Sequence, residues 1–167
     1  MILVHTALFA EAKPIIEYLK LKFITKKPFR VYKSKNVILV VTGMGDKTFL
    51  LKEIFKDYQI DRAINIGIVG CKDKNIKIGN LFCTNIVLKE IPYAKLTTTK
   101  NPIDNPDSID TPLVDMEAEY FLKVTKGIKE IYIFKIVSDH LDITIPKKEF
   151  VWKIIRNNLP KIERYFQ

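Results

Sequence analysis

Three carboxylates stand at points of the chain where ligand sites commonly form, next to the ends of predicted strands. Glu11 follows the first strand, Glu117 opens a helix, and Asp139 follows a strand together with Ser138. In a sheet of parallel strands, the ligand binds outside the carboxyl ends of the strands. Carboxyl groups can exchange protons with a substrate and accept hydrogen bonds from it. These side chains therefore predict a small-molecule site at one rim of the sheet.

Two glycine clusters are expected at the same rim. They are Gly43-Met44-Gly45 and Gly67-Ile68-Val69-Gly70, and each follows a predicted strand. Neither matches a Walker phosphate loop or a complete dinucleotide-binding fingerprint. Each feature has a structural explanation when it is taken singly, since glycines form turns, a glutamate favours a helix start and Ser-Asp often forms a cap. Their combination at one rim is what indicates a site.

The elements that must position these residues alternate between strands and helices. Short apolar runs predict strands over residues 2–8, 29–33, 37–42, 63–68, 81–88, 113–116 and 130–137. Apolar residues at helical spacing predict helices from residue 11, over 47–58 and 117–124, and over 146–165 with a break near 157–160. The second of these helices is expected to place Phe49, Leu50, Ile54 and Phe55 on one stripe. The alternation predicts an α/β fold with a largely parallel sheet.

Residues 90–112 differ from the rest of the chain. They contain four prolines, three consecutive threonines and several Asp and Asn residues. This composition predicts turns and loop. A loop of about 20 residues in a compact domain is usually functional or mobile.

Length and composition fit one domain over residues 1–167 in a cytoplasmic, reducing setting. The chain has 167 residues, of which 47% are hydrophobic and 28% charged. No apolar run approaches the ~18 residues of a membrane span, and no basic segment precedes the first apolar stretch as in a signal peptide. Two cysteines, Cys71 and Cys83, and two histidines are too few for a disulfide framework or a dedicated zinc site. No metal is expected.

The net charge of +9 raises the question of a nucleic-acid partner. The charge comes mainly from lysines that are scattered along the chain. The arginines, which read phosphates and bases better than lysine, number only four: Arg30, Arg62, Arg156 and Arg164. No basic run is interleaved with aromatic residues, so neither nucleic acid nor a membrane is predicted as a partner.

Several stretches of the chain, taken together, resemble one protein family. They cover residues 7–12 with Pro14, then 41–47, 65–70, 76–81, 114–118 and 137–139. In this order they resemble the nucleoside phosphorylase and nucleosidase superfamily, most closely the methylthioadenosine/S-adenosylhomocysteine nucleosidases. The resemblance covers nearly the whole chain. It implies a three-layer αβα sandwich with a central mixed, largely parallel sheet.

The resemblance also implies catalytic roles for three residues. Cleavage of an N-ribosidic bond passes through a cationic, oxocarbenium-like ribosyl group while the purine leaves. Asp139 would protonate N7 of the purine and make it a better leaving group. Ser138 would orient that carboxyl group, and Glu11 would activate the attacking water.

Other positions are expected to bind substrate. Glu117 would accept hydrogen bonds from the ribose hydroxyls, and Met116 would pack against the sugar. Gly43 and Gly70 would let the backbone approach the ribose and the nucleophile, because no side chain intervenes. Two further residues belong to the binding site by the same resemblance.

Ile68 stands where the family usually has a serine that helps to hold the nucleophile. Tyr93 is the candidate for the aromatic that stacks on the purine. It lies in a stretch between Leu88 and Met116 that is shorter than usual in the family.

These assignments predict hydrolysis of the N-glycosidic bond of a purine nucleoside or 5′-thio-nucleoside, without a cofactor. A purine nucleoside phosphorylase and a futalosine-type hydrolase are the close alternatives. Water is favoured over phosphate because Asn65 occupies a position where phosphorylases of the family carry arginine. The alternative of another class is a non-catalytic nucleoside-binding descendant. Because family members assemble as dimers or larger rings, a homo-oligomer, most simply a dimer, is expected.

Overall fold

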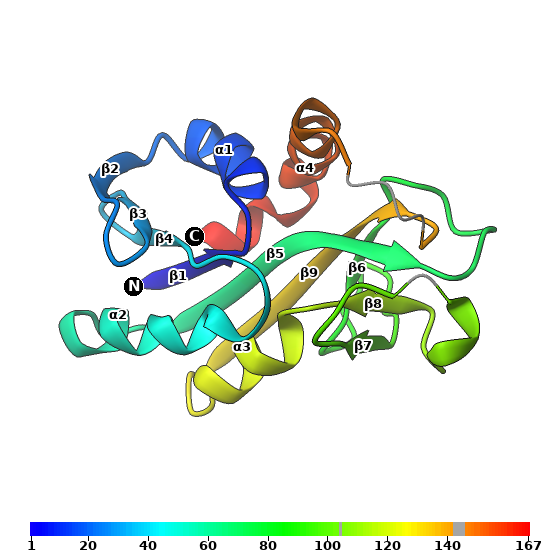
Figure 1. The fold of residues 1–167 in the computed structure, drawn as a ribbon. Helices are drawn as coiled ribbons and strands as arrows, with labels where there is room; N and C mark the ends of the chain where they lie inside the picture. Colours follow the sequence, from blue (N-terminus) through cyan, green and yellow to red (C-terminus); the bar gives the residue numbers. More distant parts are fainter. Residues whose placement is uncertain (104, 142–145) are drawn as a thin grey trace.

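The computed structural model describes residues 1–103, 105–141 and 146–167 and shows helices packed on both sides of a mixed sheet (Figure 1). Over these residues the sheet has nine strands. They are β1 (Ile2–Thr6), β2 (Lys22–Thr25), β3 (Arg30–Lys33), β4 (Val37–Val41), β5 (Arg62–Cys71), β6 (Leu81–Cys83), β7 (Leu96–Thr98), β8 (Leu113–Asp115) and β9 (Glu130–Asp139). The helices are α1 (Phe9–Tyr18), α2 (Leu51–Asp57), α3 (Ala118–Val124) and α4 (Lys148–Ile162), with short 3-10 helices η1 (Gly45–Leu50), η2 (Pro106–Ser108) and η3 (Glu163–Phe166).

The central strands are parallel and lie in the order β4-β1-β5-β9. Antiparallel strands flank them, with β3 and β2 beyond β4 and β6 beyond β9. The strand β5 has 10 residues and β1 has 5, so β5 continues past the end of β1 and pairs there with β8. As a result β8 brings residues 115–117 to the carboxyl ends of the central strands.

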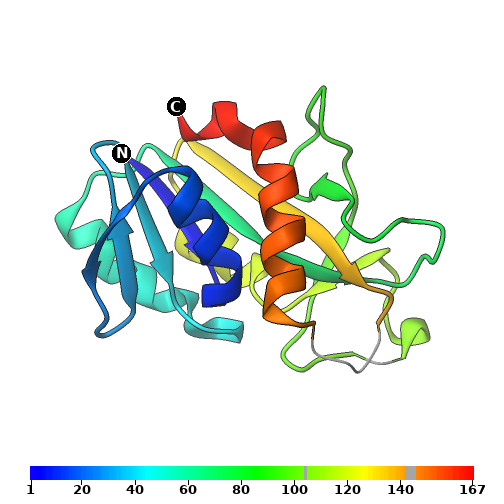
Figure 2. The same cartoon turned by 90° about the horizontal axis from the view of Figure 1, so that it is seen from above.

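Two helices cover each face of the sheet, as Figures 1 and 2 show: α1 and α4 lie on one face, and α2 and α3 on the other. Ile15 of α1 and Ile155 of α4 are fully buried in a core with Val4 of β1. On the opposite face, Phe121 of α3 packs in a second core with Leu3. Because β1 is buried on both faces, its apolar residues Ile2, Leu3 and Val4 occur consecutively in the sequence. The predicted three-layer sandwich is confirmed, with the sheet parallel at its centre and antiparallel at its edges.

The strand β5 is longer than the sequence predicts and includes both of its glycines. A Cβ atom at Gly67 would lie 3.1 Å from Oε1 of Glu11, and one at Gly70 would lie 2.6 Å from Cδ2 of Leu141. These glycines therefore leave room for side chains that pack against the strand, and Gly70, which follows the predicted strand, belongs to β5.

Two helices also differ from their predictions. The helix predicted over 47–58 begins as the 3-10 helix η1, which turns Phe49 outward so that it is 57% exposed instead of lying on the apolar stripe. The helix α4 continues without a break through Asn158 and Pro160. The amide of Asn158 donates to the carbonyls of Ile154 and Gly79, so it bonds within the helix and to a neighbouring loop. None of the helices in the part of the chain that the structure describes is long and apolar enough to cross a membrane.

The strand predicted over 81–88 is reduced to β6. Beyond it, the side chain of Asn85 donates to the carbonyl of Ile131 and accepts from the N–H of Ile133, and so takes the place of a strand partner for β9. Two strands, β2 and β7, were not predicted. The strand β7 lies within the proline-containing stretch 90–112 and pairs in parallel with β8.

Candidate active site

A cavity of about 510 Å³ opens where the carboxyl ends of β1, β5 and β9 meet the start of α3. Seven of the residues that the sequence predicts for the site line it: Glu11, Ile68, Gly70, Met116, Glu117, Ser138 and Asp139. The other lining residues are Ala7, Leu8, Met44, Val69, Thr99, Pro102, Ile103, Val114, Asp115, Leu141 and Pro146. The structure thus brings the three predicted carboxylates, which are far apart in the sequence, into one cavity.

The carboxylate of Glu11 is buried and held by two backbone N–H groups from different elements. The N–H of Leu8, just before α1, donates to Oε2 over 2.8 Å, and the N–H of Ile68 in β5 donates to Oε1 over 3.0 Å. These bonds fix the orientation of the carboxylate relative to both elements. Ile68 makes its contact through the backbone, so the contact does not depend on its side chain.

The surroundings of Glu11 favour its protonated form. Burial raises the pKa of Glu11 to about 7, and the neighbouring carboxylate of Glu117 also raises it. The N–H groups of Leu8 and Ile68 and the ammonium group of Lys135 act in the opposite direction but do not cancel this effect. A carboxyl group with a pKa of about 7 exchanges protons readily at neutral pH.

The raised pKa of Glu11 predicts a pH-dependent stability. Between about pH 4.5 and about pH 7 the folded protein retains a proton that the unfolded chain has lost. The free energy of unfolding should therefore fall as the pH rises through this window, by up to about 3 kcal/mol. Urea denaturation at successive pH values measures this dependence in the wild type and in Glu11→Gln. The variant should lack this part of the slope, and parallel pH dependences in the two proteins would contradict the assignment.

The glycine turn after β4 holds Glu117. The N–H of Gly45 donates to Oε1 of Glu117 over 2.9 Å. Gly43 and Gly45 have φ angles of 100° and 78°, in the left-handed region that glycine adopts readily. Gly43 shapes the turn, and it is not among the described residues that line the cavity, contrary to its predicted place there. Burial raises the pKa of Glu117, and the charge of Lys135 partly opposes this.

The last residues of β9 place Asp139 in the cavity with donors on both of its carboxylate oxygens. The hydroxyl of Ser138 donates to Oδ2 over 2.6 Å, and the N–H of Leu141 donates to Oδ1 over 2.9 Å. Leu141 has a φ of 64°, which is uncommon for a residue with a side chain. Its side chain occupies the space beside Gly70. Position 70 therefore needs a glycine, because a Cβ atom there would collide with Leu141, whose N–H holds Asp139.

Lys135 is a charged residue of this region that the sequence analysis did not select. It lies in β9, its side chain is 1% exposed, and its Nζ is 2.7 Å from Oδ2 of the equally buried Asp115. Burial alone would lower the pKa of Lys135, but the carboxylates of Asp115, Glu117 and Glu11 outweigh this effect and raise it. Lys135 thus provides a positive charge beneath the carboxylates of the cavity.

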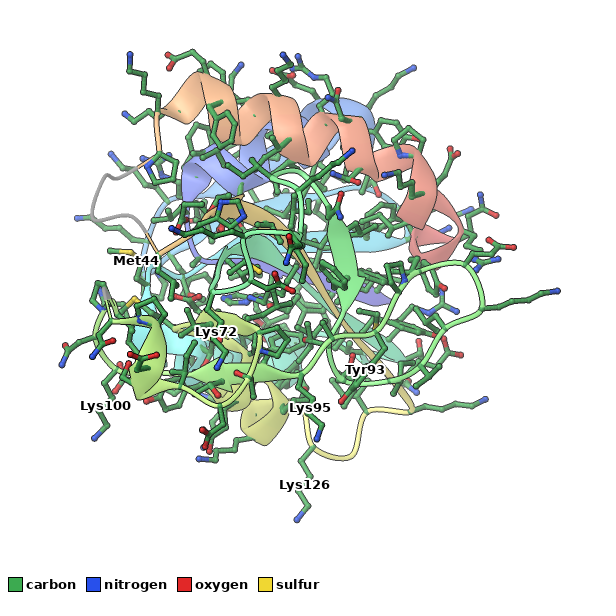
Figure 3. The ribbon with its side chains drawn as sticks, turned by 90° about the vertical axis from the view of Figure 1, so that its right-hand side faces the viewer. Met44, Lys72, Tyr93, Lys95, Lys100 and Lys126 are labelled. Carbon is green, nitrogen blue, oxygen red and sulfur yellow. The ribbon has the colours of Figure 1, made fainter. Side chains whose placement is uncertain are left out.

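Tyr93 lies away from the cavity, contrary to its predicted place in the substrate site. It is 44% exposed, and its backbone forms a bridge with Cys83 of β6. In Figure 3 it is well separated from Met44, which lines the cavity. The stretch 90–112 instead contributes Thr99, Pro102 and Ile103 to the wall. No aromatic side chain is among the lining residues that the structure describes, so the wall is mainly aliphatic.

The titratable groups of the site do not form a metal centre in the described ranges 1–103, 105–141 and 146–167. Within these ranges there is no group of three or more His, Cys, Asp or Glu side chains that could hold a metal ion.

Comparison with solved structures shows the same fold in several nucleosidases. The chain is similar to an MTAN (methylthioadenosine nucleosidase) from Chlamydia trachomatis, with 20% identity and a TM-score of 0.77 over 99% of this chain and 98% of that one. It is also similar to the 5′-methylthioadenosine/S-adenosylhomocysteine nucleosidase of Campylobacter jejuni, with 15% identity and a TM-score of 0.81 over 98% and 97%. A futalosine hydrolase mutant of Helicobacter pylori matches with 12% identity and a TM-score of 0.78 over 99% and 97%.

The Chlamydia trachomatis protein has also been solved with MTA and with adenine bound. No protein-family model matches the present chain, and no curated protein sequence matches it. The structural likeness confirms the fold that the resemblance of the sequence predicts.

Proposed function

We propose that this protein hydrolyses the N-glycosidic bond of a purine nucleoside or a 5′-thio-nucleoside and releases the base. The observation that carries the proposal is that Glu11, Glu117 and Asp139 line one cavity of a nucleosidase fold. The volume of about 510 Å³ lies in the range of small-molecule sites.

Asp139 and Glu11 match the two proton transfers of this reaction, and Glu117 serves to bind the ribose. The bond between C1′ and N9 breaks with its electron pair moving to the purine, and Asp139 supplies a proton to N7. Water adds to the cationic C1′ and gives its proton to Glu11. With a pKa of about 7, Glu11 is suited to accept this proton at neutral pH. The products are the free purine and the free sugar.

The composition of the cavity wall supports water as the nucleophile. A phosphate dianion binds where several cationic or backbone donors converge on it. Among the described residues that line the cavity there is no lysine or arginine, whereas four carboxylates are present. Asn65, at the position where related phosphorylases carry arginine, hydrogen-bonds instead to His5.

A panel of nucleosides tests the proposal. Purified protein is incubated with adenosine, inosine, methylthioadenosine, S-adenosylhomocysteine and a futalosine-type nucleoside, and release of the base is followed chromatographically. We expect release from at least one adenine or hypoxanthine nucleoside. Binding without release would instead support a non-catalytic nucleoside-binding protein, and salt-dependent binding of an oligonucleotide would support a nucleic-acid-binding module.

Glu117→Gln should weaken the reaction of a ribonucleoside more than that of its 2′-deoxy analogue. The substitution removes a charge-assisted hydrogen bond to the sugar hydroxyls, which contributes about 1.5–3 kcal/mol. Comparison of kcat/KM for the two substrates measures the difference. Glu119→Gln is the matched control, because Glu119 is an exposed residue of the same helix, paired with Lys123. Equal losses for both substrates would contradict the assignment of Glu117 to the ribose.

We further propose that the protein acts as a homodimer in the cytoplasm. Two large apolar side chains support the dimer: Met44, which lines the cavity, is 54% exposed, and Phe49 of η1 is 57% exposed. Burial of such surface favours association. The two buried thiols, Cys71 and Cys83, are free, which fits a reducing compartment.

A further inference from the structure

A network of hydrogen-bonded, buried polar side chains crosses three neighbouring strands beside the cavity, and the mechanism above does not use it. The amide of Asn65 in β5 lies 2.8 Å from Nδ1 of His5 in β1, and Nε2 of His5 lies 2.8 Å from the hydroxyl of Thr42, which follows β4. The hydroxyl of Thr42 reaches the carbonyl of Gly43 over 3.2 Å. Asn65, His5 and Thr42 are 1%, 0% and 9% exposed.

Each hydrogen bond of this network donates in the same direction, from Asn65 through His5 and Thr42 to Gly43. With the Asn65 amide in this orientation, its nitrogen donates to Nδ1 of His5, so the ring is assigned its proton on Nε2. That proton is donated to the hydroxyl of Thr42, which donates in turn to the carbonyl of Gly43. Burial, assisted by the charge of Lys135, lowers the pKa of His5 to about 3, so the neutral ring persists across the working range of pH.

These side chains contact both elements that hold Glu117, the turn at residues 43–45 and the helix α3. Gly43 begins the turn whose Gly45 N–H donates to the carboxylate of Glu117. On its other side, the His5 ring stacks on Phe121 of α3, with the ring centroids 5.4 Å apart and an interplanar angle of 16°. Phe121 donates its N–H to the carbonyl of Glu117 over 2.9 Å.

Packing alone does not require a histidine at position 5. A fully buried position in a central strand is usually filled by an apolar side chain, because a polar group there is costly unless it is hydrogen-bonded. Here both ring nitrogens are bonded, and the bonds lead to the turn beside the cavity.

We infer that His5 is a positioning residue for Glu117. Through Thr42 it fixes the turn that presents the N–H of Gly45, and through its ring face it supports the helix that Glu117 opens. One consequence, discrimination between ribose and 2′-deoxyribose, rests on the proposed function. The other, a fixed position of the Gly45 N–H that holds Glu117, does not depend on it.

Three variants test this inference. His5→Phe keeps a ring on Phe121 but removes both hydrogen bonds, Thr42→Val keeps the shape of the side chain but removes the hydroxyl, and Thr42→Ser keeps the hydroxyl as a matched control. Amide hydrogen exchange of Gly45 and of Ile133, whose N–H bonds to a distant side chain, is measured by NMR. Ile133 lies in the buried strand β9 and reports global unfolding, whereas Gly45 reports local opening of the turn, so the two rates separate a general loss of stability from a loosened turn.

In His5→Phe and Thr42→Val we expect the exchange rate of Gly45 to rise by roughly two- to tenfold, the equivalent of about one hydrogen bond. Thr42→Ser should leave it unchanged. The preference for ribonucleoside over 2′-deoxynucleoside in kcat/KM should fall by a similar factor in the first two variants. If His5→Phe does not fold, Thr42→Val decides the question.

An unchanged exchange rate of Gly45 in both His5→Phe and Thr42→Val would overturn the inference. If the wild type releases no purine, the proposed function fails, but the exchange measurement still decides whether His5 positions the turn. The two failures are therefore distinguishable.

Discussion

Asp139→Asn should lose purine release by about 10²–10⁴-fold while the protein remains folded. The amide keeps the shape of the carboxyl group but has no proton that it can transfer to N7. The fold tolerates the new side chain. In the wild type the hydroxyl of Ser138 donates to Asp139, but it also lies 3.1 Å from the carbonyl of Val69 and can donate there when an amide NH₂ replaces the carboxylate oxygen. Steady-state kinetics at saturating substrate, together with urea denaturation, separates the chemical effect from any loss of stability.

Asp73→Asn is the matched control for this substitution. Asp73 is exposed and accepts a hydrogen bond from the N–H of Asn75 in a turn. The substitution therefore tests the loss of a capping aspartate that has no catalytic role. We expect its activity to equal that of the wild type. Purine release by Asp139→Asn at a rate close to wild type would exclude Asp139 as the general acid and leave it as a second capping residue.

Lys135→Met should destabilise the protein by about 3–5 kcal/mol, because it leaves the buried carboxylate of Asp115 without its cation. The neighbouring carboxylates of Glu11 and Glu117 lose the same positive charge. Their pKa values should rise further, since Lys135 lowers both. Urea denaturation at neutral pH measures the loss, which should become smaller at acidic pH as the carboxyl groups take up protons.

Lys123→Met provides the comparison for Lys135→Met. Lys123 forms an ion pair with Glu119 on the surface of α3, and both side chains are more than half exposed. Because solvent screens such a pair, its removal should change stability little. A Lys135→Met variant as stable as Lys123→Met would show that the buried pair does not hold this part of the site together.

The ends of the parallel strands could be predicted from the sequence because they depend on local patterns. An apolar run followed by Ser138-Asp139, or by the stretch that leads to Glu11, marks the carboxyl end of a strand wherever it lies in the sheet. Parallel strands then bring these ends to one edge, which is why separate motifs converge on one cavity.

Contacts between distant strands could not be predicted in this way. The pair of Lys135 and Asp115 and the bond between His5 and Asn65 depend on which strands become neighbours, and no single stretch records that. A lone lysine in the apolar run 131–137 was the available signal for Lys135, because a charged residue in a buried strand needs a partner.

The stretch 90–112 shows the same limit. Its prolines predict turns correctly in part, but β7 forms only because β8 is there to pair with it. Because β7 pairs with β8, the residue that follows it, Thr99, lines the cavity. Tyr93, which precedes β7 and bridges to Cys83, lies outside the cavity. An aromatic residue in a loop cannot be assigned to a site until the path of the loop is known.

The central claim, hydrolysis in the cavity of Glu11, Glu117 and Asp139, is tested most directly by the sugar product. The nucleoside that reacts fastest in the panel is incubated with wild type and with Glu11→Gln, in buffers with and without phosphate, and the base and the sugar are both quantified. We predict equal amounts of free base and free sugar from the wild type, independent of phosphate, and no reaction with Glu11→Gln. A sugar 1-phosphate that forms only when phosphate is added, or undiminished release by Glu11→Gln, would contradict the account.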